Sequence, residues 1–221
     1  MKTPEPGNPL GILGGTFDPV HLAHLALAHA ALDRLGLAQV RWIPAGRPPH
    51  RASPQATPED RLAMVRRAIA DEPRFELDDS EAKSSAPSYT VQTLERLRRK
   101  LGPARPLVLL MGADAFRGLR SWHRWEDVLG LTHIAVATRP GFPLAALDAP
   151  LADLLGRCRL ARPDFSMEPA GGIVPFELVA GTVSATEARA LIAAGAPDAR
   201  LLELLPAPVL DYIRQHHLYR N

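Results

Sequence analysis

The stretch LGILGGTFDPVHLAHL, residues 10–25, decides the fold of this chain. Its first apolar residues predict a short buried strand over residues 10–13. Gly14 and Gly15 follow at once, and residues without a Cβ let backbone amides approach a ligand closely. A strand that runs directly into such a turn indicates a site for phosphate groups.

The second half of this stretch predicts the start of a helix. Asp18 followed by Pro19 is a favourable pair of residues for the N-cap and the first turn. His21 and His24 then share one face of the opening turns. A cationic imidazole at this end is opposed by the helix dipole, so a phosphate bound between the histidines and the turn would relieve the conflict.

Other interpretations of these residues remain open. The glycines and the Asp-Pro step are also ordinary turn and cap residues, and the histidines are also typical of a surface. A metal pair is a further option, but HxxH supplies only two ligands, Cys158 does not extend it, and no HExxH occurs. We therefore expect no protein-built metal site. Neither a Walker A sequence nor GxGxxG is present, which excludes nucleotide binding by those two devices.

Along the rest of the chain, short apolar runs alternate with segments of helical spacing. This alternation predicts an α/β fold, a doubly wound and mostly parallel sheet with helices on both faces. The predicted strands are residues 10–13, 38–43, 74–77, 107–111, 132–138 and 173–179. Helices are predicted from Leu22 to a C-cap at Gly36, from Thr57 onward, and around Val91, Leu94 and Leu97. We expect residues 1–9 to be a disordered extension and residues 10–221 to form a single domain.

The composition is typical of a compact enzyme. The chain has 221 residues, of which 46% are hydrophobic, enough to bury a core. Its net charge is only +2, and just three of its 26 basic residues are lysine, a bias that we attribute to codon usage and not to nucleic-acid binding. One cysteine excludes an internal disulfide. The polar N-terminus and the absence of an 18-residue apolar run predict a cytoplasmic protein without a membrane partner.

Residues that could bind a ligand follow three of the predicted strands. Gly14–Asp18 follow the first strand, Gly112–Asp114 follow LVLLM, and Arg139 follows THIAVAT. In an open α/β sheet the ligand lies beyond the carboxyl ends of the strands. We therefore expect these segments to converge on one site.

Two further patterns have both a structural and a functional interpretation. Ser184 and Glu187 form an S-x-x-E capping box, which is a sufficient structural explanation for both. The same geometry also directs hydroxyl and amide groups toward an anion, and Arg189 lies one turn beyond. Trp122 and Trp125 at helical spacing are as consistent with the core as with a stacking platform at Trp122.

The stretch GGTFDPVHLAHL resembles the signature of the HxGH nucleotidyltransferases, and in particular that of the bacterial nicotinate-nucleotide adenylyltransferases. Five later motifs resemble those of the same family in the same order. They are PPHR at 48–51, SYTVQTL at 88–94, MGADAFRGLRSWHRWEDVL at 111–129, TRPG at 138–141 and VSATEAR at 183–189. The chain departs from the family pattern at Ala23, which replaces the glycine of the histidine motif, and at Gln92, Ala185 and Ala188.

This resemblance implies transfer of AMP from ATP to nicotinate mononucleotide, with Mg²⁺ bound through the ATP phosphates. The implied catalytic residues are His21, His24 and Arg189. Those implied for ATP are Gly14, Gly15, Thr16, Phe17, Asp18, Gly112, Asp114, Arg139, Ser184 and Thr186. For nicotinate mononucleotide they are His50, Arg51, Tyr89, Thr90, Trp122 and His123. In this scheme Trp122 stacks on the pyridine ring, and Thr90 and the backbone near His123 receive its carboxylate.

Three alternative functions stay open. The chain could prefer another acceptor, such as nicotinamide mononucleotide or phosphopantetheine, although the SYT and WHRW motifs argue against the latter. It could instead be a nucleotide-binding module with little turnover, for which Ala23 is the only indication. A nucleic-acid binder is the weakest alternative, because it rests on arginine content alone. The sequence does not specify an oligomeric state.

Overall fold

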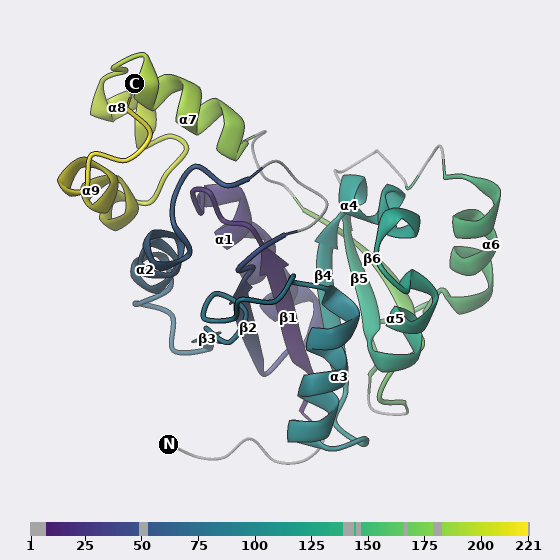
Figure 1. Cartoon of the computed structure of the whole chain (residues 1–221). Coiled ribbons are helices and arrows are strands. Elements are labelled where there is room, and N and C mark those ends of the chain that lie inside the picture. The colour runs from purple at the N-terminus through teal and green to yellow at the C-terminus, as the bar shows by residue number, and fades with distance from the viewer. Residues whose placement is uncertain are drawn as a thin grey trace. The chain divides into compact units, whose positions relative to one another are not determined.

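The computed structural model describes residues 8–48, 53–138, 144, 147–165, 168–178 and 183–220 (Figure 1). Its strands are β1 (Leu10–Gly15), β2 (Gln39–Pro44), β3 (Phe75–Leu77), β4 (Leu107–Gly112), β5 (His133–Thr138) and β6 (Ile173–Glu177). Its helices are α1 (Leu22–Leu35), α2 (Pro58–Ala68), α3 (Thr90–Leu101), α4 (Ala113–Arg117), η1 (Leu119–Ser121), α5 (Trp125–Leu131), α6 (Ala149–Cys158), α7 (Ala185–Ala193), α8 (Asp198–Leu201) and α9 (Ala207–Gln215). All the predicted strands are present, with small shifts of their ends.

The sheet has the strand order β3-β2-β1-β4-β5-β6, which is that of a doubly wound Rossmann-like sheet. β1 pairs in parallel with β4, β4 with β5, and β5 with β6. The direction of winding reverses at β1 and β4, and ligands of such sheets bind beyond the carboxyl ends of the strands at this reversal. The predicted fold class is confirmed.

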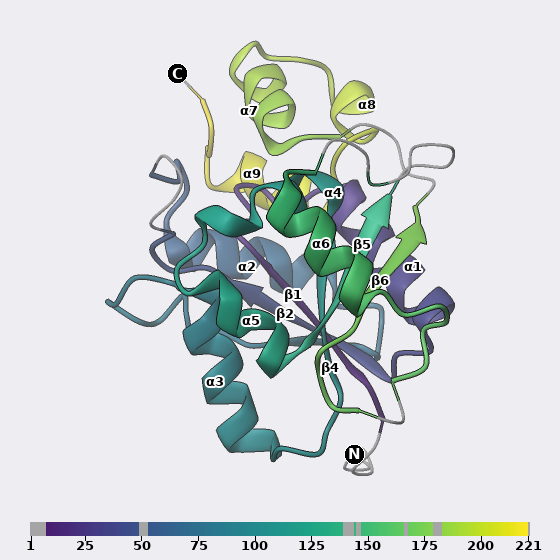
Figure 2. The same ribbon diagram turned by 90° about the vertical axis from the view of Figure 1, so that its right-hand side faces the viewer.

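The chain divides into two compact units, each assembled from separate segments. Unit 1 comprises the described residues within Met1–Leu13, Leu27–Arg41 and Tyr89–Val179. In this unit α3 packs against α5, and α4 and α5 contact β5. Figure 2 shows α5 and α6 in front of β5. Side chains of these three elements and of η1 line a cavity of about 240 Å³. β5 is buried along its whole length, as expected of a central strand covered on both faces.

Unit 2 comprises the described residues within Gly14–Ala26, Trp42–Ser88 and Ala180–Asn221. Here α9, near the C-terminus, lies beside α2, and α7 contacts α8 (Figure 1). The helix predicted from Thr57 onward is α2, and Thr57 is its N-cap, because the Thr57 hydroxyl accepts a hydrogen bond from the Asp60 N–H at 3.1 Å. Unit 2 therefore combines the C-terminal helices α7, α8 and α9 with the segments Gly14–Ala26 and Trp42–Ser88, which are distant from them in the sequence.

The helix α6 is not among the helices predicted from the sequence. It begins at Ala149, at the end of a stretch rich in glycine and proline (residues 139–150), and Asp148 caps it by accepting a hydrogen bond from the Leu151 N–H. Gly36, with a φ of +62°, ends α1 as expected of a C-cap glycine. No helix among the described residues is both long and apolar enough to cross a membrane.

Candidate functional site

Gly14 and Gly15 are the last two residues of β1, so the strand is longer than predicted and the turn expected at the glycines begins only at Thr16. Phe17 holds this turn, called the glycine turn below, in a fixed conformation. This residue has a φ of +51°, in the left-handed region, and its side chain is buried. Its ring packs edge-on against His24, with centroids 4.9 Å apart, and against Trp42 at 5.5 Å. A Cβ at Gly15 would lie 3.0 Å from the Phe17 ring, so any larger residue there would require the ring to shift. The buried ring of Phe17 therefore anchors the turn, which leaves its backbone and not its side chain available to a ligand.

The two histidines of the turn lie together, as the sequence predicts. The rings of His21 and His24 stack, with centroids 3.7 Å apart and planes 23° apart. The His21 backbone N–H donates to Nδ1 of His24 at 3.3 Å. A neutral His24 therefore carries its proton on Nε2. His21 itself precedes α1, which begins at Leu22, so only His24 belongs to the helix.

His21 is a neutral imidazole and not the expected cation. Its side chain is only 7% exposed, and this burial lowers its pKa from the ordinary value to about 4. Its Nδ1 atom is buried and has no hydrogen-bond partner among the described residues. The expectation of a positive charge opposed by the helix dipole is therefore wrong for His21. It offers a phosphate a hydrogen bond without a charge.

Asp18 does not cap α1, which corrects the expectation from the sequence. The Asp18–Pro19 peptide bond is cis, and the helix starts four residues after Asp18. The Asp18 carboxylate is only 6% exposed and points into unit 2. It accepts hydrogen bonds from the backbone N–H of Gln55 at 2.8 Å, the N–H of Ala56 at 3.1 Å and the hydroxyl of Tyr219 at 2.8 Å. Asp18 thus joins the glycine turn to segments that are distant in the sequence.

The start of α7 is attached to the same turn. Ser184 caps this helix by accepting from the Glu187 N–H at 3.1 Å, which confirms the predicted cap. Nη1 of Arg189 donates to the backbone carbonyl of Asp18 at 2.6 Å, and Nη2 to the Thr186 hydroxyl at 3.4 Å. The Arg189 side chain remains 24% exposed. The structure therefore brings Arg189 to the histidine turn, about 170 residues away in sequence.

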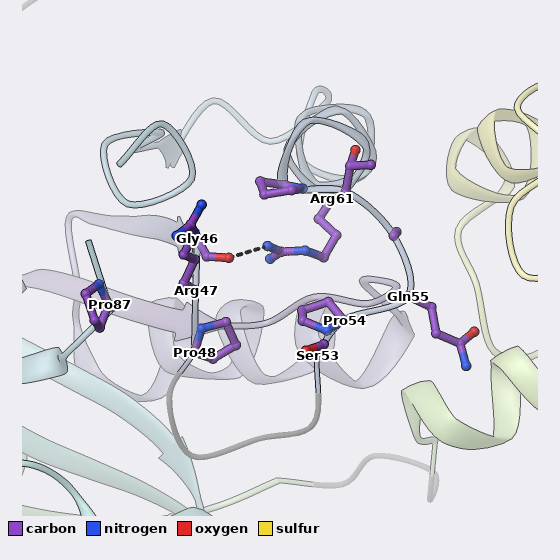
Figure 3. Close-up of a pocket in the computed structure, with 11 residues that line it drawn as sticks. Gly46, Arg47, Pro48, Ser53, Pro54, Gln55, Arg61 and Pro87 are labelled. Atoms are coloured by element: carbon purple, nitrogen blue, oxygen red, sulfur yellow. Dashed lines mark hydrogen bonds between the residues drawn. The ribbon is translucent and has the colours of Figure 1, made fainter. Parts of the chain in front are cut away.

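A second arginine, Arg61 on α2, holds the other side of the turn. Its side chain is fully buried, and burial lowers its pKa. Nη1 donates to the carbonyls of Thr16 at 2.7 Å and Ala45 at 2.5 Å. Nη2 donates to the carbonyl of Gly46 at 3.0 Å, the bond marked in Figure 3. Arg61 thus ties the glycine turn to the chain that leaves β2.

Arg61 also borders a cavity of about 600 Å³. Figure 3 shows this cavity between the segment at Gly46–Pro48 and the segment at Ser53–Gln55. The hydroxyl of Ser88 accepts from the backbone N–H of Gly46 at 3.0 Å and fixes the first segment. In the sequence, the predicted site residues His50 and Arg51 come between these two segments, and both lie outside the residues that the structure describes.

Four of the six residues predicted to bind the pyridine nucleotide belong to unit 1, namely Tyr89, Thr90, Trp122 and His123. Tyr89 immediately precedes α3 and Thr90 begins it, and the ring centroids of Tyr89 and His123 are 4.4 Å apart. Trp122 is partly exposed and follows η1, whereas Trp125 begins α5. The two tryptophans therefore do not share one helix, because Arg124 between them adopts a left-handed conformation that separates the helices.

The residues that follow β4 and β5 were also expected at the ligand. Gly112 ends β4 and is the N-cap of α4, where no side chain blocks the backbone N–H groups. Asp114 lies in the first turn of α4, is fully exposed, and pairs with Arg117 at 2.6 Å. An exposed carboxylate at this position can accept from a hydroxyl of a ligand. Arg139 lies outside the described residues.

Sequence reasoning missed two residues of this site, Arg61 and Tyr219. Arg61 had a detectable signal, because it lies one turn before the buried Val65 and therefore on the apolar face of α2. Tyr219 had none, since its partner Asp18 is 201 positions away. Within the described ranges no group of three His, Cys, Asp or Glu residues could hold a metal ion.

Comparison with known sequences finds relatives in the family that the sequence motifs resemble. A family model described as cytidylyltransferase-like matches residues 12–190. A protein of Dechloromonas aromatica named probable nicotinate-nucleotide adenylyltransferase is 54% identical over 216 residues, which cover 96% of this chain and 98% of that protein. A protein of the same name from Stenotrophomonas maltophilia is 48% identical over 215 residues, covering 94% of this chain and 95% of its own length.

A solved structure shares the fold. The nicotinic acid mononucleotide adenylyltransferase of Plasmodium falciparum, complexed with NaAD, superimposes with a TM-score of 0.74 at 16% identity. The match covers 96% of this chain and 97% of that one. At this identity the likeness concerns the fold alone.

Proposed function

Since this chain belongs to the cytidylyltransferase-like family and, within it, to the nicotinate-nucleotide adenylyltransferases, we propose that it transfers AMP from ATP to nicotinate mononucleotide. The products are nicotinate adenine dinucleotide and pyrophosphate, and the reaction is a step in NAD biosynthesis. One observation within unit 2 carries the proposal. The stacked pair His21–His24 and the guanidinium of Arg189 are joined through the Asp18 turn. These are hydrogen-bond donors of the kind that transferring phosphates need.

The reaction needs positioning more than it needs a protein nucleophile. A phosphate oxygen of nicotinate mononucleotide attacks the α-phosphorus of ATP, and a new P–O bond forms there. The bond from the α-phosphorus to the bridging oxygen breaks, and pyrophosphate leaves with the electron pair. The attacking oxygen is already anionic near neutral pH, so no Ser or Cys nucleophile is required. The protein aligns the two substrates and stabilises the charge on the phosphoryl groups.

The roles of the donors follow from their electrostatics. Arg189 supplies a permanent positive charge, and its side chain is partly exposed, so it can contact the phosphates of ATP. His24 donates from Nε2 when its Nδ1 accepts from His21. His21, whose pKa is about 4, stays neutral at physiological pH and donates without adding charge. The hydroxyls of Ser184 and Thr186, at the start of α7, complete the phosphate-binding set together with the positive end of that helix.

The remaining predicted residues would bind the other parts of the substrates. Trp122, partly exposed, offers a face for the pyridine ring. Thr90 and the backbone near His123 would receive the pyridine carboxylate. We assign the ribose of ATP to the exposed Asp114, and the phosphate of the mononucleotide to His50 and Arg51.

Mg²⁺ enters this scheme as part of the substrate MgATP. Magnesium commonly binds through substrate phosphates with few protein ligands. The ion would neutralise the charge of the leaving pyrophosphate.

A pyrophosphate-release assay tests the proposed function. The purified protein is incubated with MgATP and either nicotinate mononucleotide, nicotinamide mononucleotide or no acceptor. We expect release with the acid, slower release with the amide and none without an acceptor. Release that is independent of the acceptor would indicate a pyrophosphohydrolase, and no release with either acceptor would contradict the proposal.

A further inference from the structure

The C-terminal segment contributes a side chain to the interior of the site-forming unit. Tyr219 is the third residue from the end of the chain, and its side chain is 9% exposed. Its hydroxyl donates to Oδ1 of Asp18 at 2.8 Å. Its backbone has a φ of +60°, a left-handed conformation that non-glycine residues adopt only where the surrounding structure enforces it.

Asp18 is the point at which several segments of unit 2 are fixed. Its carboxylate holds the backbone N–H groups of Gln55 and Ala56, and its carbonyl oxygen holds Arg189. Gln55 and Ala56 end the segment that contains His50 and Arg51. The position of Asp18 therefore affects both the guanidinium of Arg189 and one end of that segment.

We propose that Tyr219 is a positioning residue for the transfer reaction. Its hydroxyl fixes the carboxylate of Asp18, the residue whose carboxylate holds the Gln55–Ala56 backbone and whose carbonyl oxygen holds Arg189. This inference rests on the proposed function. Tyr219 itself would touch neither substrate, since its hydroxyl is already bonded to Asp18 inside the unit.

The chemistry of the contact explains why tyrosine is suited to this position. Burial and the nearby Asp18 charge raise the pKa of Tyr219 well above its usual range, so its hydroxyl remains a donor at any pH at which the enzyme works. Without this hydroxyl the buried carboxylate loses a donor. A cation lies close by, because Nη1 of Arg189 is 3.9 Å from Oδ2 of Asp18. Arg189 would move toward the carboxylate and away from the phosphates.

Tyr212 offers a matched control in the same unit. Its hydroxyl donates to Oδ1 of Asp60 at 2.8 Å, the same distance as in the Tyr219–Asp18 contact, and its side chain is 7% exposed. Asp60 lies in the first turn of α2. Tyr212→Phe thus removes an equivalent Tyr–Asp hydrogen bond that has no contact with Asp18 or Arg189 in the structure.

The test compares Tyr219→Phe, Tyr212→Phe and the parent in two measurements. The first is kcat/KM for MgATP, measured well below the melting temperature of each protein. The second is hydrogen exchange at the amides of Gln55 and Ala56. We expect kcat/KM to fall about tenfold in Tyr219→Phe and to stay within twofold in Tyr212→Phe. We also expect faster exchange at both amides in Tyr219→Phe alone.

The possible outcomes distinguish the positioning role of Tyr219 from the proposed adenylyl transfer. If the kinetics of Tyr219→Phe match those of Tyr212→Phe, or if the two amides exchange at the parent rate, Tyr219 does not position the site. A parent protein without pyrophosphate release refutes the proposed function, while the exchange data still decide whether Tyr219 holds Asp18. Asp18→Asn, which keeps one acceptor oxygen, should reproduce both changes and serves as a second variant if Tyr219→Phe folds poorly.

Discussion

Acidification is expected to destabilise the protein through His21, the histidine that burial keeps neutral. Its pKa in the folded chain is about 4, whereas an unfolded histidine titrates near pH ~6.5. Because the folded pKa is the lower one, the unfolded state takes up the proton first. The contribution of His21 to stability is therefore complete above pH ~6.5 and is lost as the pH falls toward ~4.

The size of this effect follows from the two pKa values. Linkage between a pKa of about 4 in the folded state and about 6.5 in the unfolded state lowers the free energy of unfolding by about 2 kcal/mol at pH 5. At pH 4 the loss is about 3 kcal/mol, a large part of the stability of an ordinary domain. His133 adds a loss of the same sign, because burial also lowers its pKa.

Urea unfolding of the parent and of His21→Phe, followed by tryptophan fluorescence between pH 7 and pH 4, isolates the contribution of His21. The phenylalanine keeps a ring against His24 but does not titrate, and His133 is present in both proteins and cancels. We expect the difference in unfolding free energy between parent and variant to change by about 3 kcal/mol over this range. His217→Asn, at an exposed histidine, should follow the parent. Parallel pH profiles for the parent and His21→Phe would refute the reasoning.

Three further outcomes are expected. His24→Ala should lower kcat by about a hundredfold, because it removes a donor to the transferring phosphates, with little change in nicotinate mononucleotide binding or melting temperature. A turnover within threefold of the parent would exclude this role for His24. The acid should exceed the amide acceptor at least about tenfold in kcat/KM, since donors at Thr90 and its neighbours pair with a carboxylate but leave an amide NH₂ unpaired; equal efficiencies would contradict this. Arg61→Met should lower the free energy of unfolding by about 3 kcal/mol or more, because it leaves three carbonyls without their donor. Arg66→Met, at an exposed arginine on the same helix, should change the free energy of unfolding by less than about 0.5 kcal/mol. Similar losses in the two variants would show that Arg61 does not hold these carbonyls.

The sequence by itself determined the order and type of the main elements. Buried strands such as β4 and β5 have an apolar run at their centre, and helices such as α2 carry their own cap and apolar spacing. These signals are local, because hydrogen bonds and side-chain faces within a helix or strand depend on residues a few positions apart. The stacked histidines and the cap at Ser184 were predictable for the same reason.

Only the tertiary structure decided what the charged and polar residues of the turn do. Asp18 looked like a local helix cap, but its carboxylate binds donors that lie 37, 38 and 201 positions away. His21 looked like a surface cation, and burial among distant segments makes it neutral. Desolvation and long-range hydrogen bonds depend on which segments fold over a residue. A local sequence pattern carries no record of those segments, so the roles of Asp18, His21 and Tyr219 appear only once the chain is packed.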